Sequence, residues 1–202
     1  MPATYTLPEL PYKLNALEPY ISEKEMDVHY NSHHKTYAVK TTETFATHPE
    51  LEQKPIEEYL AHLDDLPADI RGKVKNFGGG LANHDFYWHS LTPNADSKVP
   101  EELEEAISKK WGSVSAFLAA FKTSLLGVFG SGWAWLVKKH DKSLEIVTTP
   151  NQDRPSNEYV PLLAIDVWEH AYAYQTGPNR AAYIDNVFHI INWNMVAKRF
   201  SE

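Results

Sequence analysis

The stretch from Ser22 to His48 contains no proline and no glycine, and it restricts the fold more than any other part of the chain. Ser22 and Glu25, three residues later, form a capping box, a pair typical of a helix N-terminus. Nothing interrupts a helix before Pro49, so it can extend over roughly 40 Å at about 1.5 Å per residue. A helix of this length is long for a globular domain.

A second long helix is predicted over residues 68–91, after a short helix within residues 55–67. Three consecutive glycines, residues 78–80, leave two interpretations of this segment open. Glycine is costly inside a helix, so the plain interpretation is a loop. In the other interpretation the helix continues, and the glycines remove side chains where a neighbouring helix approaches closely.

The segment TPNADSKVP, residues 92–100, is polar, rich in turn formers and free of large apolar side chains. It is predicted to be the linker between two domains. The expected boundaries are therefore an N-terminal helical-hairpin domain at residues 1–92 and a C-terminal α/β domain at residues 93–202.

The C-terminal domain is predicted to combine helices with a small sheet. Helices are expected from Pro100, over residues 113–128 and over residues 181–200. Residues 133–149 read as two short strands about a polar turn, and residues 159–168 form a third apolar run. The fold class is α+β, an antiparallel helical hairpin followed by an α/β domain with a small three-stranded antiparallel sheet.

Composition limits the function. The formal net charge of -8 argues against a nucleic-acid partner, and no run is long and apolar enough to span a membrane. The opening segment has neither a signal-peptide nor a transit-peptide pattern, so a cytoplasmic location is expected, or the mitochondrial matrix if a presequence was removed. The chain has no cysteine, so any metal must be bound by His, Asp or Glu.

The predicted first helix carries several histidines. His29, His33 and Tyr37 are spaced by four residues, so they share one face, whereas His34 points elsewhere. A surface helix of a chain with 10 histidines can carry such a pattern by chance. The spacing alone therefore does not establish a site.

Two other stretches favour a metal site. The sequence NHDFYWHSL places His84 beside aromatic residues, and IDVWEHAYAY places Asp166 and His170 around Trp168. Each could be a buried polar residue satisfied by hydrogen bonds. Together, in a chain without cysteine, they fit a site of three histidines and one carboxylate, which suits redox chemistry and also zinc hydrolysis.

Asp166 closes the third apolar run. If that strand continued, His170 would lie ~13 Å away, too far to share an ion. The chain must therefore turn directly after Asp166.

Nearly the whole chain resembles the iron and manganese superoxide dismutases. The similarity is carried by LPELPYKLNALEPYIS, HHKTY, NHDFYW, GSGWAWLV and, most specifically, DVWEHAYAY. The resemblance implies that the metal ligands are His29, His84, Asp166 and His170. It implies that Tyr37 and His33 line the substrate channel, that Trp133, Trp135 and Trp168 form an aromatic wall, that Glu169 and Tyr172 lie at a dimer contact, and that Arg180 is a family arginine.

The type of metal depends on a glutamine in this family. Iron-type members usually carry it four residues before the second ligand, where this chain has Gly80, and manganese-type members carry it in the sheet, where Gln152 stands. The resemblance thus favours manganese, with iron as the alternative. Departures from the family pattern include Leu81, Ala173 and Ser32, none of which replaces a ligand.

The implied function is disproportionation of superoxide to dioxygen and hydrogen peroxide, with protons supplied through Gln152 and Tyr37. A homodimer or homotetramer is expected. One alternative is an inactive dismutase-like structural protein. The other is a metal-dependent hydrolase on the same ligands, which would require a general base near the metal-bound water.

Overall fold

A computed structural model describes residues 2–202. The predicted first long helix is present as three consecutive segments: α1 (Glu23–Asp27), a π-helical turn η1 (Val28–His34) and α2 (Lys35–Ala46). Ser22 is its N-cap, and its side chain accepts a hydrogen bond from the Glu25 backbone N–H at 3.2 Å. The π-helical turn was not predicted, since the sequence has no glycine or proline to mark it.

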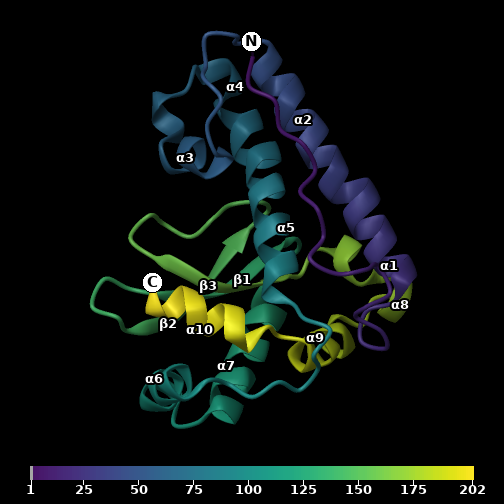
Figure 1. Cartoon of the computed structure of the whole chain (residues 1–202), viewed down its shortest axis with the longest axis vertical. Coiled ribbons are helices and arrows are strands. Elements are labelled where there is room, and N and C mark those ends of the chain that lie inside the picture. The colour runs from purple at the N-terminus through teal and green to yellow at the C-terminus, as the bar shows by residue number, and fades with distance from the viewer. Residues whose placement is uncertain (1) are drawn as a thin grey trace.

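The second long helix consists of α4 (Ala68–Lys73), a π-helical turn η3 (Val74–Gly78) and α5 (Gly79–Ser90), preceded by α3 (Ile56–Ala61) and a 3₁₀ turn η2 (Leu63–Asp65). It runs antiparallel to α2 and lies beside it (Figure 1).

The three glycines of the second helix are helical, so the loop interpretation is wrong and close packing is confirmed. A Cβ atom on Gly80 would overlap the ring of Tyr37, which belongs to α2. A Cβ atom on Gly79 would overlap the backbone oxygen of Gln152. The cost of glycine in a helix is offset here by the approach of two neighbouring segments.

The predicted sheet is also present. It contains β1 (Gly132–Lys138), β2 (Leu144–Pro150) and β3 (Val160–Asp166) in the antiparallel order β2-β1-β3. The central strand β1 is buried along its whole length, which explains its continuous apolar sequence. Its register pairs Trp133 with Asp166, so the end of β3 lies beside the start of β1.

The remaining helical segments are α6 (Glu101–Trp111), α7 (Val114–Gly127), a 3₁₀ turn η4 (Glu169–Ala171), α8 (Ala173–Thr176), α9 (Arg180–His189) and α10 (Trp193–Ser201). Of these, α6, α7 and α10 pack against the sheet, and α8 packs against α1.

The single helix expected over residues 181–200 is wrong, because the chain breaks between α9 and α10. Ile191 leaves the helix to form a β-bridge with Leu91, and Asn192 caps α10 by accepting from the Met195 backbone N–H at 3.1 Å. The long-range contact to Leu91 leaves no trace in the local pattern of apolar residues.

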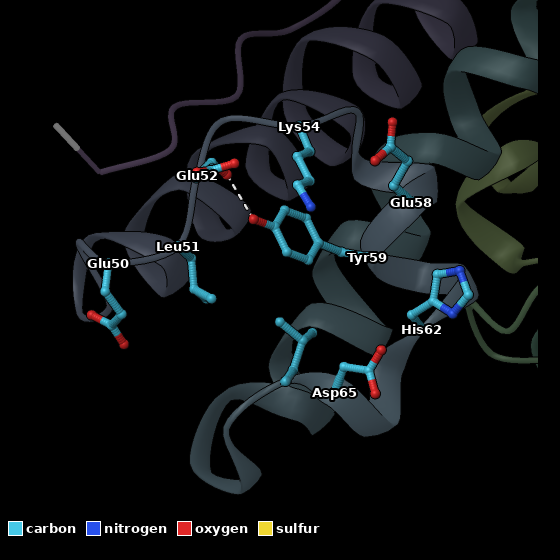
Figure 2. Close-up of a pocket in the computed structure, with 9 residues that line it drawn as sticks. Glu50, Leu51, Glu52, Lys54, Glu58, Tyr59, His62 and Asp65 are labelled. Carbon is cyan, nitrogen blue, oxygen red and sulfur yellow. Dashed lines mark hydrogen bonds between the residues drawn. The ribbon is translucent and has the colours of Figure 1, made fainter.

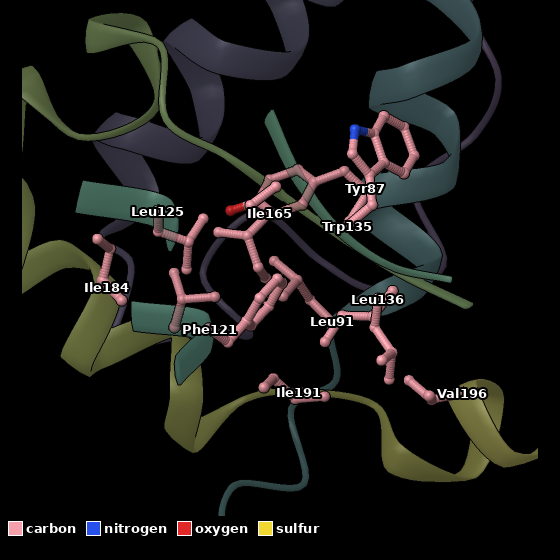
Figure 3. Packing of buried hydrophobic residues seen from close by; sticks show 14 of the residues in the cluster. Tyr87, Leu91, Phe121, Leu125, Trp135, Leu136, Ile165, Ile184, Ile191 and Val196 are labelled. Atoms are coloured by element: carbon pink, nitrogen blue, oxygen red, sulfur yellow. The ribbon is translucent and has the colours of Figure 1, made fainter. Parts of the chain in front are cut away.

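The hydrophobic core has two clusters. The larger packs the sheet against α5, α7, α9 and α10, and Figure 3 shows Tyr87, Leu91 and Trp135 within it. The smaller lies between α2 and the helices α3 to α5. Because α5 contributes to both clusters, the polar residue His84 in its middle lies between two apolar masses.

No helix within residues 2–202 has the length and apolar character needed to cross a membrane.

Candidate metal centre

Four predicted side chains from different parts of the chain converge on one point. His29 comes from the π-helical turn of the first helix, His84 from α5, Asp166 from the end of β3 and His170 from η4. One ligand atom from each lies within 4.8 Å of the others. The Nε2 atoms of His29, His84 and His170 lie 3.2, 3.4 and 3.1 Å from Asp166 Oδ2.

The predicted turn after Asp166 is confirmed. Asp166 Oδ1 accepts a hydrogen bond from the Trp168 backbone N–H at 2.8 Å, which bends the chain directly at the end of β3. The 3₁₀ turn that follows brings His170 back to the other carboxylate oxygen. One carboxylate therefore both shapes the turn and faces the site.

Burial sets the charges of these groups. It lowers the pKa of His29 to about 4 and the pKa of His84 well below its usual value, so both imidazoles are neutral at pH 7. Burial would raise the pKa of Asp166, but the charge and hydrogen bonds of His170 and His29 hold it below its usual range. The centre therefore presents two imidazoles that are neutral at pH 7, those of His29 and His84, and one ionised carboxylate.

The donor set fits a metal ion. His29 Nε2 is buried and makes no well-aligned hydrogen bond, although Asp166 Oδ2 lies 3.2 Å away, and a buried polar atom of this kind is costly unless something binds it. The Nε2 atoms of His84 and His170 are only 3.3 Å apart. His84 Nδ1 lies 2.7 Å from the Gly80 carbonyl oxygen and can donate to it, which leaves Nε2 free with its lone pair toward the centre.

The predicted residues Tyr37 and Gln152 meet behind His84. Gln152 is only 3% exposed, its Nε2 donates to Tyr37 Oη at 3.0 Å, and its Oε1 accepts from Trp133 Nε1 at 3.1 Å. Burial and the charge of Asp166 raise the pKa of Tyr37 to about 12. Tyr37 is therefore a protonated phenol beside the centre at neutral pH.

Sequence reasoning missed Asn83. Its Nδ2 donates to the Gln152 backbone oxygen at 3.0 Å and approaches Gln152 Oε1 at 3.4 Å, so it fixes the segment that carries the glutamine. Its position directly before His84 in the NHDFYW motif was the available signal.

Aromatic rings surround the ligands. His170 stacks with His33 at 4.4 Å and with Trp168 at 5.2 Å between ring centroids. Trp133 meets His84 edge to face at 5.2 Å. Trp135 packs beside Trp133, with ring centroids 5.9 Å apart, and its Nε1 donates to Thr149 Oγ1 at 2.9 Å.

His34, which points away from the face shared by His29, His33 and Tyr37, is a packing residue and not a surface residue. It is fully buried, its Nδ1 accepts from Trp88 Nε1 at 3.1 Å, and its Nε2 lies 3.1 Å from the Leu81 oxygen. Because Nδ1 accepts, the ring proton is on Nε2 and is donated to Leu81.

The remaining predicted residues are Glu169, Tyr172 and Arg180. Glu169 is exposed. Tyr172 is buried, and its Oη accepts from Arg180 Nε at 3.2 Å. Arg180 also donates to the backbone oxygens of Val128 and Gly130 at 2.7 Å each, so its guanidinium holds the loop on either side of residue 129.

A separate surface pocket lies between the segment after α2 and the helix α3. Its lining includes Glu50, Glu52, Glu58 and Asp65, and Tyr59 donates to the Glu52 backbone oxygen at 2.6 Å (Figure 2). It contains none of the residues of the metal centre.

Comparisons with known proteins match the full length of the chain. The model of the iron/manganese superoxide dismutase α-hairpin domain matches residues 4–92, and that of the C-terminal domain of the same family matches residues 99–199. Proteins named "Superoxide dismutase [Mn]" from Listeria innocua serovar 6a, Listeria monocytogenes serovar 1/2a and Listeria ivanovii are each 46% identical over 198 residues, which is 98% of this chain and 98% of each relative.

Proposed function

Because the chain belongs to the iron/manganese superoxide dismutase family, we propose that it disproportionates superoxide at one manganese ion held by His29, His84, Asp166 and His170. The observation that carries the proposal is the convergence of three imidazole Nε2 atoms on one carboxylate oxygen, at 3.1 to 3.4 Å. Three imidazole nitrogens and one carboxylate are a ligand set that suits a first-row redox metal.

A manganese ion held by these four residues would supply the one-electron redox chemistry that the reaction requires. The overall reaction consumes two superoxide anions and two protons and yields one dioxygen and one hydrogen peroxide. The chain must therefore deliver two protons for each pair of substrates.

Tyr37 and Gln152 are placed for this proton delivery. Gln152 donates to Tyr37 Oη, so the phenol oxygen accepts and its own proton remains free to be donated elsewhere. The raised pKa of Tyr37, about 12, keeps that proton in place at neutral pH. Trp133 and Asn83 hold Gln152 in the required orientation.

The placement of Gln152 supports manganese rather than iron. It reaches the centre from the turn directly after β2, two residues beyond the sheet in which the manganese-type resemblance places the glutamine. Position 80, where iron-type members usually carry the glutamine, is closed because any Cβ atom there would overlap the Tyr37 ring. The relatives described above are also named for manganese.

The two alternatives lack comparable support. An inactive structural relative would not need four ligands brought together within 4.8 Å. A hydrolase needs a general base beside the metal, and the flanking groups described here are the phenol of Tyr37, the amide of Gln152 and the imidazole of His33, whose pKa is lowered by burial, which makes it a weaker base.

The proposal also assigns roles to residues around the ligands. His33, Trp168 and Trp133 would face the substrate, and Trp135 would pack behind Trp133. Arg180 and Tyr172 would hold the neighbouring loop. These roles are supported by the ring stacking on His170 and His84 and by the bonds from Arg180 to the loop.

A homodimer or homotetramer is also proposed. Glu169 is exposed beside His170, and Phe129, in the loop held by Arg180, is completely exposed. A second copy that covers this side would bury Phe129 and let Glu169 of the partner subunit reach His170, where a carboxylate orients the ring.

The division into domains at residues 1–92 and 93–202 is supported by the two family models, which end at residue 92 and begin at residue 99. A cytoplasmic location is supported by the bacterial origin of the relatives. Nothing supports the mitochondrial alternative.

The function is tested by comparing manganese-loaded protein with apoprotein in a superoxide assay. The loaded protein should consume two superoxide anions for each hydrogen peroxide formed, and the apoprotein should add nothing to the spontaneous reaction. A loaded protein that leaves superoxide decay unchanged would refute the proposal.

A further inference from the structure

The capping box of the first helix is completed by a residue from the other end of the chain. In an ordinary capping box the glutamate side chain returns to the N–H of the N-cap residue. Here the Ser22 N–H donates instead to Gln175 Oε1 at 2.7 Å. The Glu25 carboxylate turns away and accepts from the Gln175 backbone N–H at 2.8 Å.

Gln175 makes two further bonds to the segment that leads into α1. Its Nε2 donates to the backbone oxygens of Pro19 and Tyr20 at 3.3 and 3.2 Å. One residue of α8 thus satisfies several polar groups around the start of the first helix, and Figure 1 shows α8 beside α1. We refer to Ser22, Glu25 and Gln175 with these bonds as the Glu25–Gln175 bridge.

Glu25 is an unusual residue for its surroundings. It is 1% exposed, and its Oε1 is buried with no hydrogen-bond partner. Burial raises the pKa of this carboxyl, while the bond from Gln175 opposes the rise. Since a buried carboxyl with an unsatisfied oxygen costs stability, the helix does not gain from Glu25 alone.

The bridge links the segments that carry two metal ligands. His29 follows Glu25 by one turn of the same helix, and His170 precedes Gln175 by five residues. The rings of His29 and His170 lie 4.8 Å apart between centroids, yet no hydrogen bond joins them among the described residues. Besides the shared contact with Asp166 and the stacking of His33 on His170, contacts elsewhere on the two segments can therefore help to fix their separation.

We propose that Glu25 and Gln175 are positioning residues that hold His29 opposite His170, and that their bridge sets how tightly the centre retains its metal. This inference rests on the proposed function only in taking both histidines as ligands. Glu25 does not touch the metal site itself; it acts by joining the two ligand-bearing segments at their base.

The test is the rate at which manganese-loaded protein releases its metal to an excess of chelator at neutral pH. Glu25→Ala should release manganese about tenfold faster, equivalent to about 1.4 kcal/mol. Glu25→Gln should stay within about threefold of the parent, because its amide oxygen can still accept from the Gln175 N–H. Gln175→Ala should release metal faster than the parent, and Glu23→Ala, at an exposed position on the same turn, should not.

Unfolding midpoints of the loaded protein and apoprotein separate positioning from general stability. The metal-induced rise in midpoint should shrink in Glu25→Ala and be restored in Glu25→Gln. Equal losses in both forms, with an unchanged release rate, would overturn the inference. If Glu25→Ala does not fold, Gln175→Ala decides, since its side chain is exposed. A parent protein that retains no manganese would instead count against the proposed function.

Discussion

The two sides of the metal centre are built differently. On the Gln152 side, polar groups are satisfied within the chain: Trp133 donates to the glutamine, the glutamine donates to Tyr37, and Asn83 holds its backbone. On the His170 side, Glu169 is exposed and Phe129 projects fully from its loop.

In the proposed dimer or tetramer, this difference separates what one chain completes from what a second copy would complete. The Gln152 side is fixed by close packing, in which Gly79 and Gly80 leave room for Gln152 and Tyr37 and for no other atoms. The His170 side is fixed by stacking of His33 and Trp168 on His170 and by the Glu25–Gln175 bridge. Changes on the first side should act on folding and chemistry, and changes on the second on metal retention and assembly.

The largest effect is expected from the ligands, where the two sides meet. Asp166→Ala and His170→Ala should lose essentially all bound metal after dialysis, because each removes one of four donors. His140→Ala, at an exposed histidine in the turn between β1 and β2, is the control and should bind as the parent does. The measurement is the ratio of metal to protein. Full retention in Asp166→Ala would show that the four side chains do not hold the ion.

Gly80→Ala tests the closed packing of the Gln152 side. The new methyl group would displace the Tyr37 ring and break its bond with Gln152, so we expect a loss of about 1–3 kcal/mol in the free energy of unfolding, together with lower activity. Gly72→Ala is the matched control. No atom lies within 4 Å of its added Cβ, so it should stabilise the helix by up to about 1 kcal/mol. Equal behaviour of the two variants would contradict the packing argument.

His34, which also packs beside His84, should make the free energy of unfolding depend on pH. Burial lowers the pKa of His34 to about 4 in the folded protein, against about 6.5 when unfolded, so the unfolded chain binds a proton first as pH falls. Its contribution to stability is complete above pH 6.5 and is lost as the pH falls toward 4. Between pH 7 and pH 5 the parent should lose roughly 2 kcal/mol relative to His34→Gln in denaturant unfolding. A constant difference between the two proteins would show that His34 titrates normally.

Glu169→Ala tests the His170 side and should have the smallest effect on the stability of the isolated chain. We expect the dimer dissociation constant to rise about tenfold, or about 1.4 kcal/mol, measured by sedimentation. Glu50→Ala, at an exposed residue of the separate surface pocket, is the control. An unchanged oligomer that also keeps its metal would contradict the role assigned to Glu169.

Much of the fold was predictable because its signals are local. The helix starts at Ser22 and Pro100, the three apolar strands and the turn forced after Asp166 each follow from a few neighbouring residues. The four residues of the metal centre were identified by their residue types and by resemblance, and the structure brings them together.

The features that were missed depend on distant partners. Whether Gly80 is helical is decided by the Tyr37 ring, and the break at Ile191 is decided by Leu91, a hundred residues earlier in the chain. Asn83 and Gln175 act through bonds to residues far away in the sequence. No local pattern contains that information, so only the assembled structure reveals these roles.

The central claim is that this centre is a manganese site completed by Gln152. It is tested most directly by reconstituting apoprotein separately with manganese and with iron and measuring specific activity at equal metal occupancy. Manganese should give the higher activity, because the glutamine beside the centre is Gln152, as in manganese-type members. The position where iron-type members usually carry a glutamine is Gly80, and the Tyr37 ring leaves no room for a side chain there. Higher activity with iron would contradict the assignment.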